Sequence, residues 1–357
     1  MEIIENRSWT YSYLRGTIDA MTFSSSSSDA SIHHLGSLNT SPLGFGCMGL
    51  SQGYGATDDN ESIAAVHTAI NSGVTMFDTA MSYGQGHNEE LVGRAIATSG
   101  VDRDDLQIAT KFGIVRGENG VHLDAHPSRI ARYCEDSLRR LGTDVIDLYY
   151  LHRVDPQVPI EDSIAAMANL VEQGKVRHIG VSEVTSDELR RASAVHPIAA
   201  VQMEWSLMWR EPETNIVPTA RELGVGLVPY SPLGRGLLGG RLDTTTVPES
   251  PFRANDPRFI GANLDENMRQ VDALASLAKT WSMTIAQVAL AWLIAQGDDV
   301  VPIPGTRKSS RVLENVAAMH NHFNSADLTA LEDAVPTSKW VGDRQSFAVP
   351  ITTRPTY

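Results

Sequence analysis

The sequence predicts a single (β/α)8 barrel, and three observations support this fold class. Eight short β-rich segments alternate along the chain with segments of amphipathic helical periodicity. The β-rich segments are mostly continuous in apolar residues, which is typical of strands buried on both faces of a parallel sheet. Most of them recur at intervals of about 30 residues, the length of one βα unit. Eight such units favour a closed barrel over an open, doubly wound sheet.

The predicted strands and helices follow one another in regular order. The strands are expected at 43–47, 74–77, 106–110, 145–151, 176–181, 198–203, 224–230 and 300–303. The first helix, 58–72, has acidic residues in its first turn and an apolar face, and Gly73 follows its end. Two further helices with comparable start and stop signals are expected at 127–141 and 159–173. Before the last strand, the chain leaves room for an extra loop, 241–267, and for helices at 268–281 and 284–296.

Composition and charge exclude several classes of protein. The chain has 357 residues, with 43 acidic and 29 Lys or Arg side chains, and a formal net charge of −14. This balance argues against a nucleic-acid-binding protein, which usually needs a basic face. The only cysteines, Cys47 and Cys134, do not make a disulfide framework, so we expect a reducing, cytoplasmic location. No apolar run approaches the roughly 18 residues of a membrane span, and no membrane partner is expected.

The first 36 residues differ from the rest of the chain. They contain a run of five serines at 24–28, and such a segment buries too little apolar area to offset its ordering entropy. We therefore expect a disordered extension at 1–36 and one barrel domain at 37–357. Met21 also opens a plausible start of its own, so residues 1–20 either precede the natural start or form a genuine disordered tail.

A glycine-rich segment after the seventh predicted strand literally matches GxGxxG. It runs from Gly234 to Gly239. In a Rossmann domain this motif lies in the first βα turn, with an acidic residue about 20 positions further on. Here the motif comes late and a Pro- and Thr-rich loop follows it. We interpret it as the phosphate-binding loop that barrels commonly carry after the seventh strand.

Four polar residues stand where neighbouring predicted strands end. Asp78, Lys111 and His152 directly follow the second, third and fourth strands, and Tyr83 lies in the loop after Asp78. The carboxyl ends of barrel strands form the active-site face, so these groups are expected to converge. An ammonium beside the phenol would lower its pKa, and an aspartate would keep that ammonium charged. The set suits proton donation to a carbonyl oxygen that is becoming an alkoxide, with the imidazole hydrogen-bonded to that oxygen.

Each of these residues alone could be structural, but four in consecutive units favour a functional site. A metal site is not expected, because no HExxH motif occurs and the strand-end residues are not part of a Cys/His cluster. The only HxH pair, His320 and His322, lies in a polar stretch beyond the last predicted strand.

Six motifs resemble those of the aldo-keto reductase superfamily, in the order that the family shows. They are FDTAMSYG at 77–84, ATK at 109–111, DLYYLH at 147–152, GKVRHIGVS at 174–182, PYSPLG at 229–234 and IPGTRK at 303–308. The likeness extends from about residue 35 to residue 334, and it is nearest to bacterial-type, pyridoxal-reductase-like and channel-β-subunit-like members. It implies an NADP-dependent enzyme of the carbonyl reductase type, which transfers hydride from NADPH to an aldehyde or ketone. Tyr83 would be the general acid, tuned by Lys111 and Asp78, and His152 would orient the carbonyl.

The resemblance also implies which residues bind NADPH in an extended form. Gly46, Cys47, Met48 and Asp78 match positions beside the cofactor, and Ser182 and Gln202 match side chains that hydrogen-bond the carboxamide. Tyr230 matches the aromatic residue that stacks on the nicotinamide, and Ser231, Leu233 and Gly236 match the pyrophosphate loop. The adenosine end would be held by Gly305, Thr306, Arg307, Arg311, Glu314 and Asn315. Cys47 and Glu183 stand where other members commonly have threonine and asparagine.

A basic cluster near the C-terminus bears on the choice of cofactor. Arg307, Lys308 and Arg311 lie close together in a chain of net charge −14. A 2′-phosphate needs a cation, whereas a free ribose diol prefers an acidic partner. The cluster therefore favours NADPH over NADH.

Two other functions stay open. One is a regulatory protein that uses the bound cofactor as a redox sensor, as channel β-subunits of this superfamily do. The other is a reductase directed at an aldose or at pyridoxal. The segments expected to shape the substrate site, 241–267 and the chain beyond Pro336, transfer least well between relatives. The sequence leaves the substrate, the preferred direction and the oligomeric state open.

Overall fold

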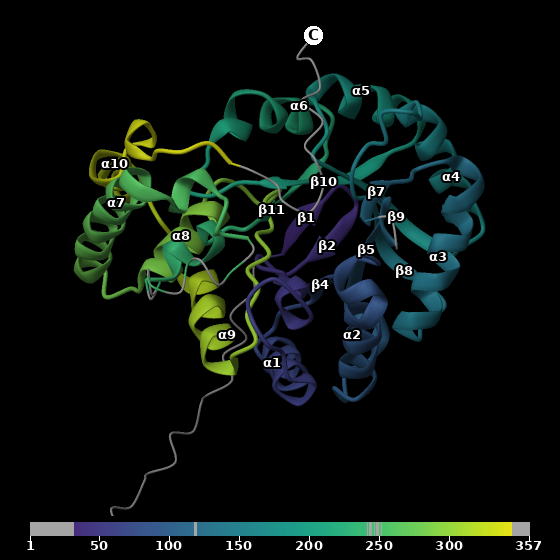
Figure 1. Ribbon diagram of the computed structural model, residues 1–357, viewed down its shortest axis with the longest axis horizontal. Coiled ribbons are helices and arrows are strands. Elements are labelled where there is room, and N and C mark those ends of the chain that lie inside the picture. Colours follow the sequence, from purple (N-terminus) through teal and green to yellow (C-terminus); the bar gives the residue numbers. More distant parts are fainter. Residues whose placement is uncertain are drawn as a thin grey trace, which may run out of the picture. The chain divides into compact units, whose positions relative to one another are not determined.

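The computed structural model describes residues 32–117, 120–240 and 252–344, together with positions 242, 245, 247 and 250. Its centre is a seven-stranded parallel sheet in the order β11-β10-β9-β8-β5-β4-β3, in which each strand lies beside the one that precedes it within this sheet. The strands are β3 (Phe45–Gly46), β4 (Met76–Asp78), β5 (Gln107–Phe112), β8 (Ile146–Leu151), β9 (Val176–Ser182), β10 (Ile198–Glu204) and β11 (Gly226–Tyr230). Seven of the eight predicted strands thus form the expected sheet, and the sheet curves into a barrel (Figure 1).

The eighth predicted strand closes the barrel without a complete hydrogen-bond ladder. On one edge of the segment 299–304, the amides of Val301 and Ile303 donate to β11 carbonyls at 2.9 and 3.1 Å. On the other edge, the carbonyls of Pro302 and Pro304 accept from glycine amides of the first barrel strand at 3.0 and 3.1 Å. Proline has no N–H to donate in return, so the segment is extended and paired but is not a regular strand.

Helices follow the strands and surround them (Figure 1). They are α1 (Asp59–Asn71), α2 (His87–Ala97), α3 (Pro127–Leu141), α4 (Ile160–Glu172), α5 (Ser186–Val195), α6 (Ile216–Glu222), α7 (Gly261–Thr280), α8 (Ile285–Ile294), α9 (Ser309–Val316) and α10 (Ser325–Ala334). Their ends follow local chemistry: Asp58 caps α1 by accepting from the amide of Glu61 at 2.8 Å, and Gly142 ends α3 with φ 65°. The predicted end of the long loop 241–267 is wrong, because α7 already begins at Gly261.

A short hairpin closes the amino-terminal end of the barrel. It consists of β1 (His33–Leu35) and β2 (Leu38–Thr40), and it starts before the predicted domain boundary at residue 37. Leu35 and Leu38 are buried in the same apolar cluster as the barrel interior, which also includes Leu148 and Val228. The amide of His34 donates to the carbonyl of Asp298 at 2.7 Å and ties the hairpin to the closing segment. Of the proposed extension 1–36, residues 1–31 lie outside the described residues, and residues 33–36 belong to this hairpin.

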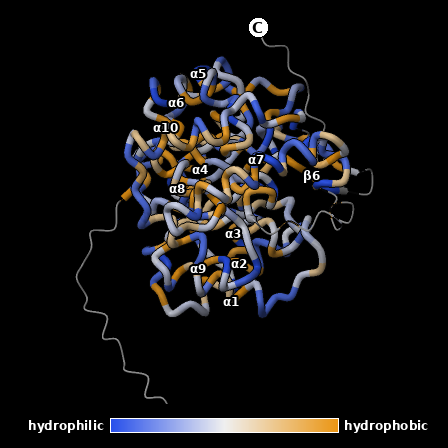
Figure 2. Tube along the Cα trace, turned by 90° about the vertical axis from the view of Figure 1, so that its left-hand side faces the viewer, coloured by the Kyte–Doolittle hydropathy of each residue, from blue (hydrophilic) through white to orange (hydrophobic). Residues whose placement is uncertain are grey.

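A second hairpin stands on the opposite, carboxyl-terminal side of β5. Its strands β6 (Ile114–Gly117) and β7 (Gly120–Leu123) are antiparallel, and the sequence analysis did not anticipate them. Along the whole barrel, hydrophobic segments gather inside and hydrophilic segments lie outside (Figure 2). Within the described part of the chain no single helix is long and apolar enough to cross a membrane, and α7 and α8 pass that test only as a pair bent by 83°.

Replacing Leu35 with alanine should destabilise the fold, because the hairpin is held by apolar burial at the barrel floor. The Leu35 side chain is fully buried, and such truncations typically cost about 3 kcal/mol of unfolding free energy. The matched control is Leu313→Ala, since Leu313 is 55% exposed and should change stability by less than about 0.5 kcal/mol. Urea unfolding followed by circular dichroism measures both variants. Equal losses in the two would contradict a structural role for the hairpin.

Candidate active site

A buried ion pair lies at the centre of the candidate site. Asp78 ends β4 and Lys111 lies on the neighbouring β5, and both side chains are almost fully shielded from solvent. The Lys111 ammonium donates to Asp78 Oδ1 and, at 2.7 Å, to the carbonyl of Thr79. Gln202 on β10 donates to Asp78 Oδ2 at 2.8 Å from across the barrel. Burial by itself would lower the pKa of Lys111, but the charge of Asp78 outweighs it and keeps the lysine protonated.

Tyr83 and His152 complete the predicted set of four. The Tyr83 ring lies edge-on to the His152 ring, with centroids 5.9 Å apart, and Lys111 Nζ is 5.2 Å from the Tyr83 centroid. Burial raises the pKa of Tyr83, and although the charge of Lys111 lowers it as expected, burial outweighs that charge and the pKa lies above its ordinary value. Burial, together with Arg153, Lys111 and Arg116, holds the pKa of His152 well below its ordinary value. The site therefore presents a protonated phenol and a neutral imidazole at neutral pH.

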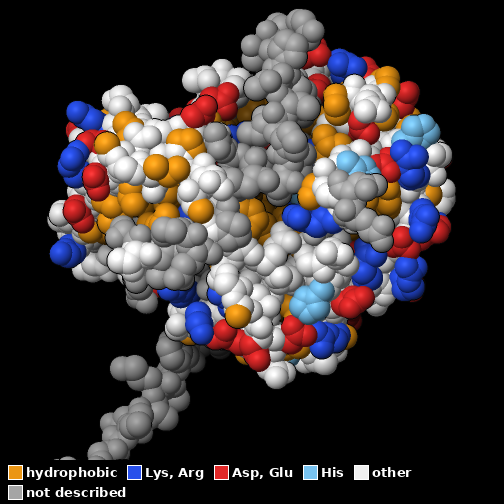
Figure 3. Space-filling model, viewed as in Figure 1, with side chains coloured by type: hydrophobic (Ala, Val, Ile, Leu, Met, Phe, Trp, Pro, Cys, Tyr) orange, Lys and Arg blue, Asp and Glu red, His pale blue; other side chains and the backbone are white. Residues whose placement is uncertain are grey.

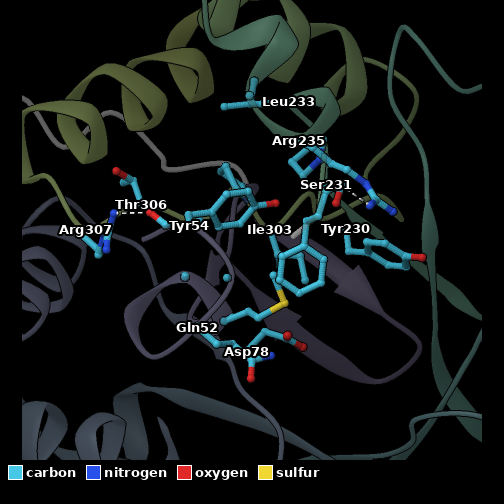
Figure 4. A pocket seen from close by; sticks show the side chains of 18 of the residues that line it. Gln52, Tyr54, Asp78, Tyr230, Ser231, Leu233, Arg235, Ile303, Thr306 and Arg307 are labelled. Atoms are coloured by element: carbon cyan, nitrogen blue, oxygen red, sulfur yellow. Dashed lines mark hydrogen bonds between the residues drawn. The ribbon is translucent and has the colours of Figure 1, made fainter. Parts of the chain in front are cut away.

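These groups open into a cavity of about 620 Å³. Asp78, Tyr83 and His152 line it, whereas Lys111 does not line the cavity but contacts Asp78, which does. Figure 4 shows Arg307 and Thr306 on one side of the cavity and Tyr230 on the opposite side, with aromatic and apolar side chains between them. A long cavity of this kind can hold an extended ligand that connects its two ends.

Most of the predicted cofactor residues line this cavity. Those that do are Gly46, Met48, Asp78, Gln202, Tyr230, Ser231, Leu233, Gly236, Gly305, Thr306, Arg307, Arg311, Glu314 and Asn315. Cys47 and Ser182 are not among the lining residues. The Cys47 thiol is fully buried and faces the carbonyl of Phe45 at 3.6 Å, and burial raises its pKa. Ser182 Oγ accepts a hydrogen bond from Arg153 at 3.1 Å.

The glycine-rich segment forms a tight loop at the cavity wall. This 3-10 turn, η5 (Gly234–Gly239), follows β11 and has φ near +50 to +100° at Gly234, Arg235 and Gly236. A side chain at Gly236 would come within 2.7 Å of the guanidinium of Arg253. A backbone bend beside an arginine is suited to an anionic group, which agrees with the interpretation of this motif as a phosphate loop.

Two loops meet over the middle of the cavity. The Tyr54 ring lies 5.8 Å from that of Phe252, and the Arg253 guanidinium lies 5.3 Å from the Tyr54 centroid. Ser250 Oγ donates to the carbonyl of Gly53 at 3.3 Å. All of these side chains line the cavity, so contacts between segments far apart in the sequence form part of its wall.

The predicted basic cluster divides into two parts. Arg307 donates to the carbonyl of Tyr54 at 2.8 Å and Lys308 pairs with Glu61 of α1, so the first contacts a neighbouring loop and the second a neighbouring helix. Arg311 lines the cavity, and its side chain has no hydrogen bond or ion pair with any of the described residues, although its amide donates to the carbonyl of Lys308 at 2.9 Å. Its guanidinium is thus the member of the cluster that stays available to an anionic ligand.

Comparison with known proteins places this arrangement in a family. The model of the Aldo/keto reductase family matches residues 42–336. The chain belongs to this family. It is 46% identical to the probable aldo-keto reductase 1 of Glycine max over 306 residues, which covers 85% of this chain and 88% of the relative.

Solved structures agree with the fold of this aldo-keto reductase. The glycerol dehydrogenase of Gluconobacter oxydans superimposes with a TM-score of 0.79 at 29% identity, covering 92% of this chain and 98% of that one. An aldo/keto reductase from Klebsiella pneumoniae, solved in complex with NADP and acetate, gives a TM-score of 0.67 at 27% identity. It covers 86% of this chain and 95% of its own. The expectation of a (β/α)8 barrel of the aldo-keto reductase type is confirmed.

This aldo-keto reductase also has a buried charge network that the sequence analysis missed. Arg258 forms hydrogen bonds with Asp256 at 2.7 Å and with Glu204, at the end of β10, at 2.6 Å. Arg344, near the end of the described chain, pairs with Glu183 after β9 and donates to the Tyr230 hydroxyl at 3.1 Å. The network fixes the segment before α7 and the C-terminal segment to the strand ends.

Replacing Arg344 with methionine should destabilise the enzyme in a pH-dependent way. Burial would raise the pKa of Glu183, but Arg344 lowers it to about 2, below the value near 4.3 of an unfolded chain. The pairing therefore stabilises the fold at pH values above the pKa of Glu183 in the unfolded chain, and this contribution is lost as the pH falls toward 2. We expect a loss of roughly 3 kcal/mol at pH 7 that shrinks at pH 4, where an unpaired Glu183 can take up a proton.

Urea unfolding at pH 7 and pH 4 measures this dependence. The control is the double variant Arg344→Met with Glu183→Gln, which removes both charges and should recover much of the stability at pH 7. A loss that is the same at both pH values, or no recovery in the double variant, would refute the assigned role of the pair.

Proposed function

We propose that this chain is an NADPH-dependent carbonyl reductase that reduces an aldehyde or ketone to the alcohol. The observation that carries this proposal is the buried Asp78–Lys111 pair beside Tyr83 and His152, in a cavity that Arg311 also lines. Family membership supports the same activity, and the Klebsiella pneumoniae relative was solved with NADP bound.

The lining residues fit an extended NADPH molecule. Tyr230 offers an aromatic ring to the nicotinamide, and Gln202 an amide to its carboxamide. A side chain at Gly46 would come within 2.6 Å of the Ile303 carbonyl, because the two backbone segments run close together there. Gly46 therefore lines the cavity without a side chain that would occupy it. The loop η5 with Arg253 suits the pyrophosphate, and Arg311 suits the 2′-phosphate. Cys47 and Ser182 would act indirectly, by packing behind the residues that contact the cofactor.

When bound, the cofactor supplies the hydride for the carbonyl carbon. Tyr83 keeps its proton at neutral pH because burial raises its pKa, so it can give that proton to the oxygen that becomes the alcohol. The charge of Lys111 stabilises the phenolate that remains, and Asp78 keeps Lys111 charged and in place. Neutral His152 can hold the carbonyl oxygen through its ring N–H.

Tyr83→Phe should lower kcat by about three orders of magnitude or more while NADPH binding stays within about threefold, because only the proton donor is removed. The control is Tyr133→Phe, since the Tyr133 hydroxyl donates to Asp124 at 2.6 Å and does not line the cavity. Absorbance at the NADPH maximum measures turnover with a panel of aldehydes, and fluorescence titration measures binding.

Turnover of Tyr83→Phe at the wild-type rate would overturn the role of Tyr83. A wild-type protein that binds NADPH but turns over no carbonyl in the panel would favour the redox-sensor function over the enzyme.

Arg311→Ala should raise the KM for NADPH by at least about tenfold and change the KM for NADH by less than about twofold, because only NADPH carries the 2′-phosphate. Arg132→Ala serves as the control, since Arg132 lies on the outer face of α3 with its side chain 83% exposed. Steady-state kinetics with both cofactors give the comparison. Equal effects on the two cofactors would count against the assignment of Arg311.

A further inference from the structure

The geometry points to a carbonyl substrate that carries a negative charge, held by Arg116 at the catalytic end of the cavity with Arg153 beside it. This inference rests on the proposed function and narrows it to a substrate class, anionic aldehydes and ketones. It is carried by two arginines that line the cavity near His152 and that none of the proposed cofactor contacts uses.

Arg116 reaches the cavity from the hairpin β6–β7. Ile114 and Arg116 stand two positions apart on β6, so their side chains project from the same face of the strand, and both line the cavity. Arg116 Nε is shielded from solvent and has no hydrogen-bond partner among the described residues. Because a buried guanidinium nitrogen without a partner is unfavourable, this nitrogen is available to an acceptor group of a ligand in the cavity.

Arg153 approaches the same end of the cavity from the loop after β8. It donates to the carbonyl of His152 at 2.7 Å and to Ser182 Oγ at 3.1 Å, and these two contacts fix its direction. The charges of Arg153 and Arg116 both lower the pKa of His152, as expected of cations near the imidazole. A ligand in contact with His152 is therefore close to two positive charges.

The nearby carboxylates do not neutralise these two cations. Asp78 is paired with Lys111, and Glu183 is paired with Arg344. The catalytic end is thus locally positive, although the chain as a whole has a net charge of −14. In Figure 3, Lys or Arg side chains adjoin hydrophobic side chains at the centre of the visible face, whereas acidic and basic side chains are mixed around its rim.

A carboxylate or a phosphate on the substrate would satisfy this site. Both anions match the planar fork of a guanidinium, and hydrogen bonds between charged partners are among the stronger ones in proteins. Arg116 and His152 line the same cavity, so a carbonyl held by His152 could carry its anionic group toward Arg116. The hydrophobic Ile114 would contact the carbon skeleton between the two groups.

Two pairs of substrates, each with and without the anion, test the inference with the full chain. They are 4-carboxybenzaldehyde with benzaldehyde, and glyceraldehyde 3-phosphate with glyceraldehyde. We expect kcat/KM to be at least about tenfold higher for the anionic member of one pair or both, and the pair affected tells carboxylate from phosphate. In Arg116→Met this anionic preference should fall about tenfold, and in Arg116→Lys part of it should remain. Arg132→Met, on the exposed face of α3, should leave the preference unchanged.

A measurement without turnover separates this inference from the proposed function. Isothermal titration calorimetry with NADP⁺ present compares 4-carboxybenzyl alcohol with benzyl alcohol, and the carboxylate should bind at least about tenfold more tightly to wild type than to Arg116→Met. If no carbonyl compound is reduced, the reductase activity fails while calorimetry still decides the anion site. Equal kcat/KM within both pairs, or an anionic preference that Arg116→Met leaves intact, would overturn the inference.

Discussion

The buried pair of Asp78 and Lys111 is the constraint on which the rest of the site depends. Two charges without solvent contact cost several kcal/mol each unless their geometry is fixed and their remaining hydrogen bonds are made. Here the carbonyl of Thr79 and the amide of Gln202 complete that pairing. The ion pair therefore connects β4 and β5 with β10 on the other side of the barrel. Tyr83 and His152 are thereby placed against a lysine that cannot lose its charge without exposing an unpaired carboxylate.

The barrel was predictable because its strands are buried on both faces. Continuous apolar runs mark such strands, and the first polar residue after each run marks the active-site edge, which is how Asp78, Lys111 and His152 could be found. The same rule failed where the signal is weak. The closing segment 299–304 contains prolines, which pair on one edge through their carbonyls alone, and the hairpin β6–β7 is too short and too polar to show a pattern.

The charge network lay beyond reach of the sequence for a different reason. Arg344 pairs with Glu183 from 161 positions away, and Arg258 with Glu204 from 54 positions away, and nothing in the local pattern of any of these residues marks its partner. The family resemblance likewise indicated Cys47 and Ser182 by position but not by orientation. Neither residue is among those that line the cavity: the Cys47 thiol faces the carbonyl of Phe45, and Ser182 Oγ accepts from the guanidinium of Arg153.

The distribution of charge explains how an acidic protein can bind anionic ligands. At physiological ionic strength the field of exposed carboxylates is screened beyond about 8 Å, so a net charge of −14 has little influence inside the cavity. Several cations line the cavity itself, among them Arg311, Arg253 and, near His152, Arg116 and Arg153. Low solvent access strengthens these local charges relative to the surface charges. An anion is therefore repelled weakly on approach and attracted by these local charges once it is inside the cavity, whose wall includes the contact between Tyr54 and Phe252.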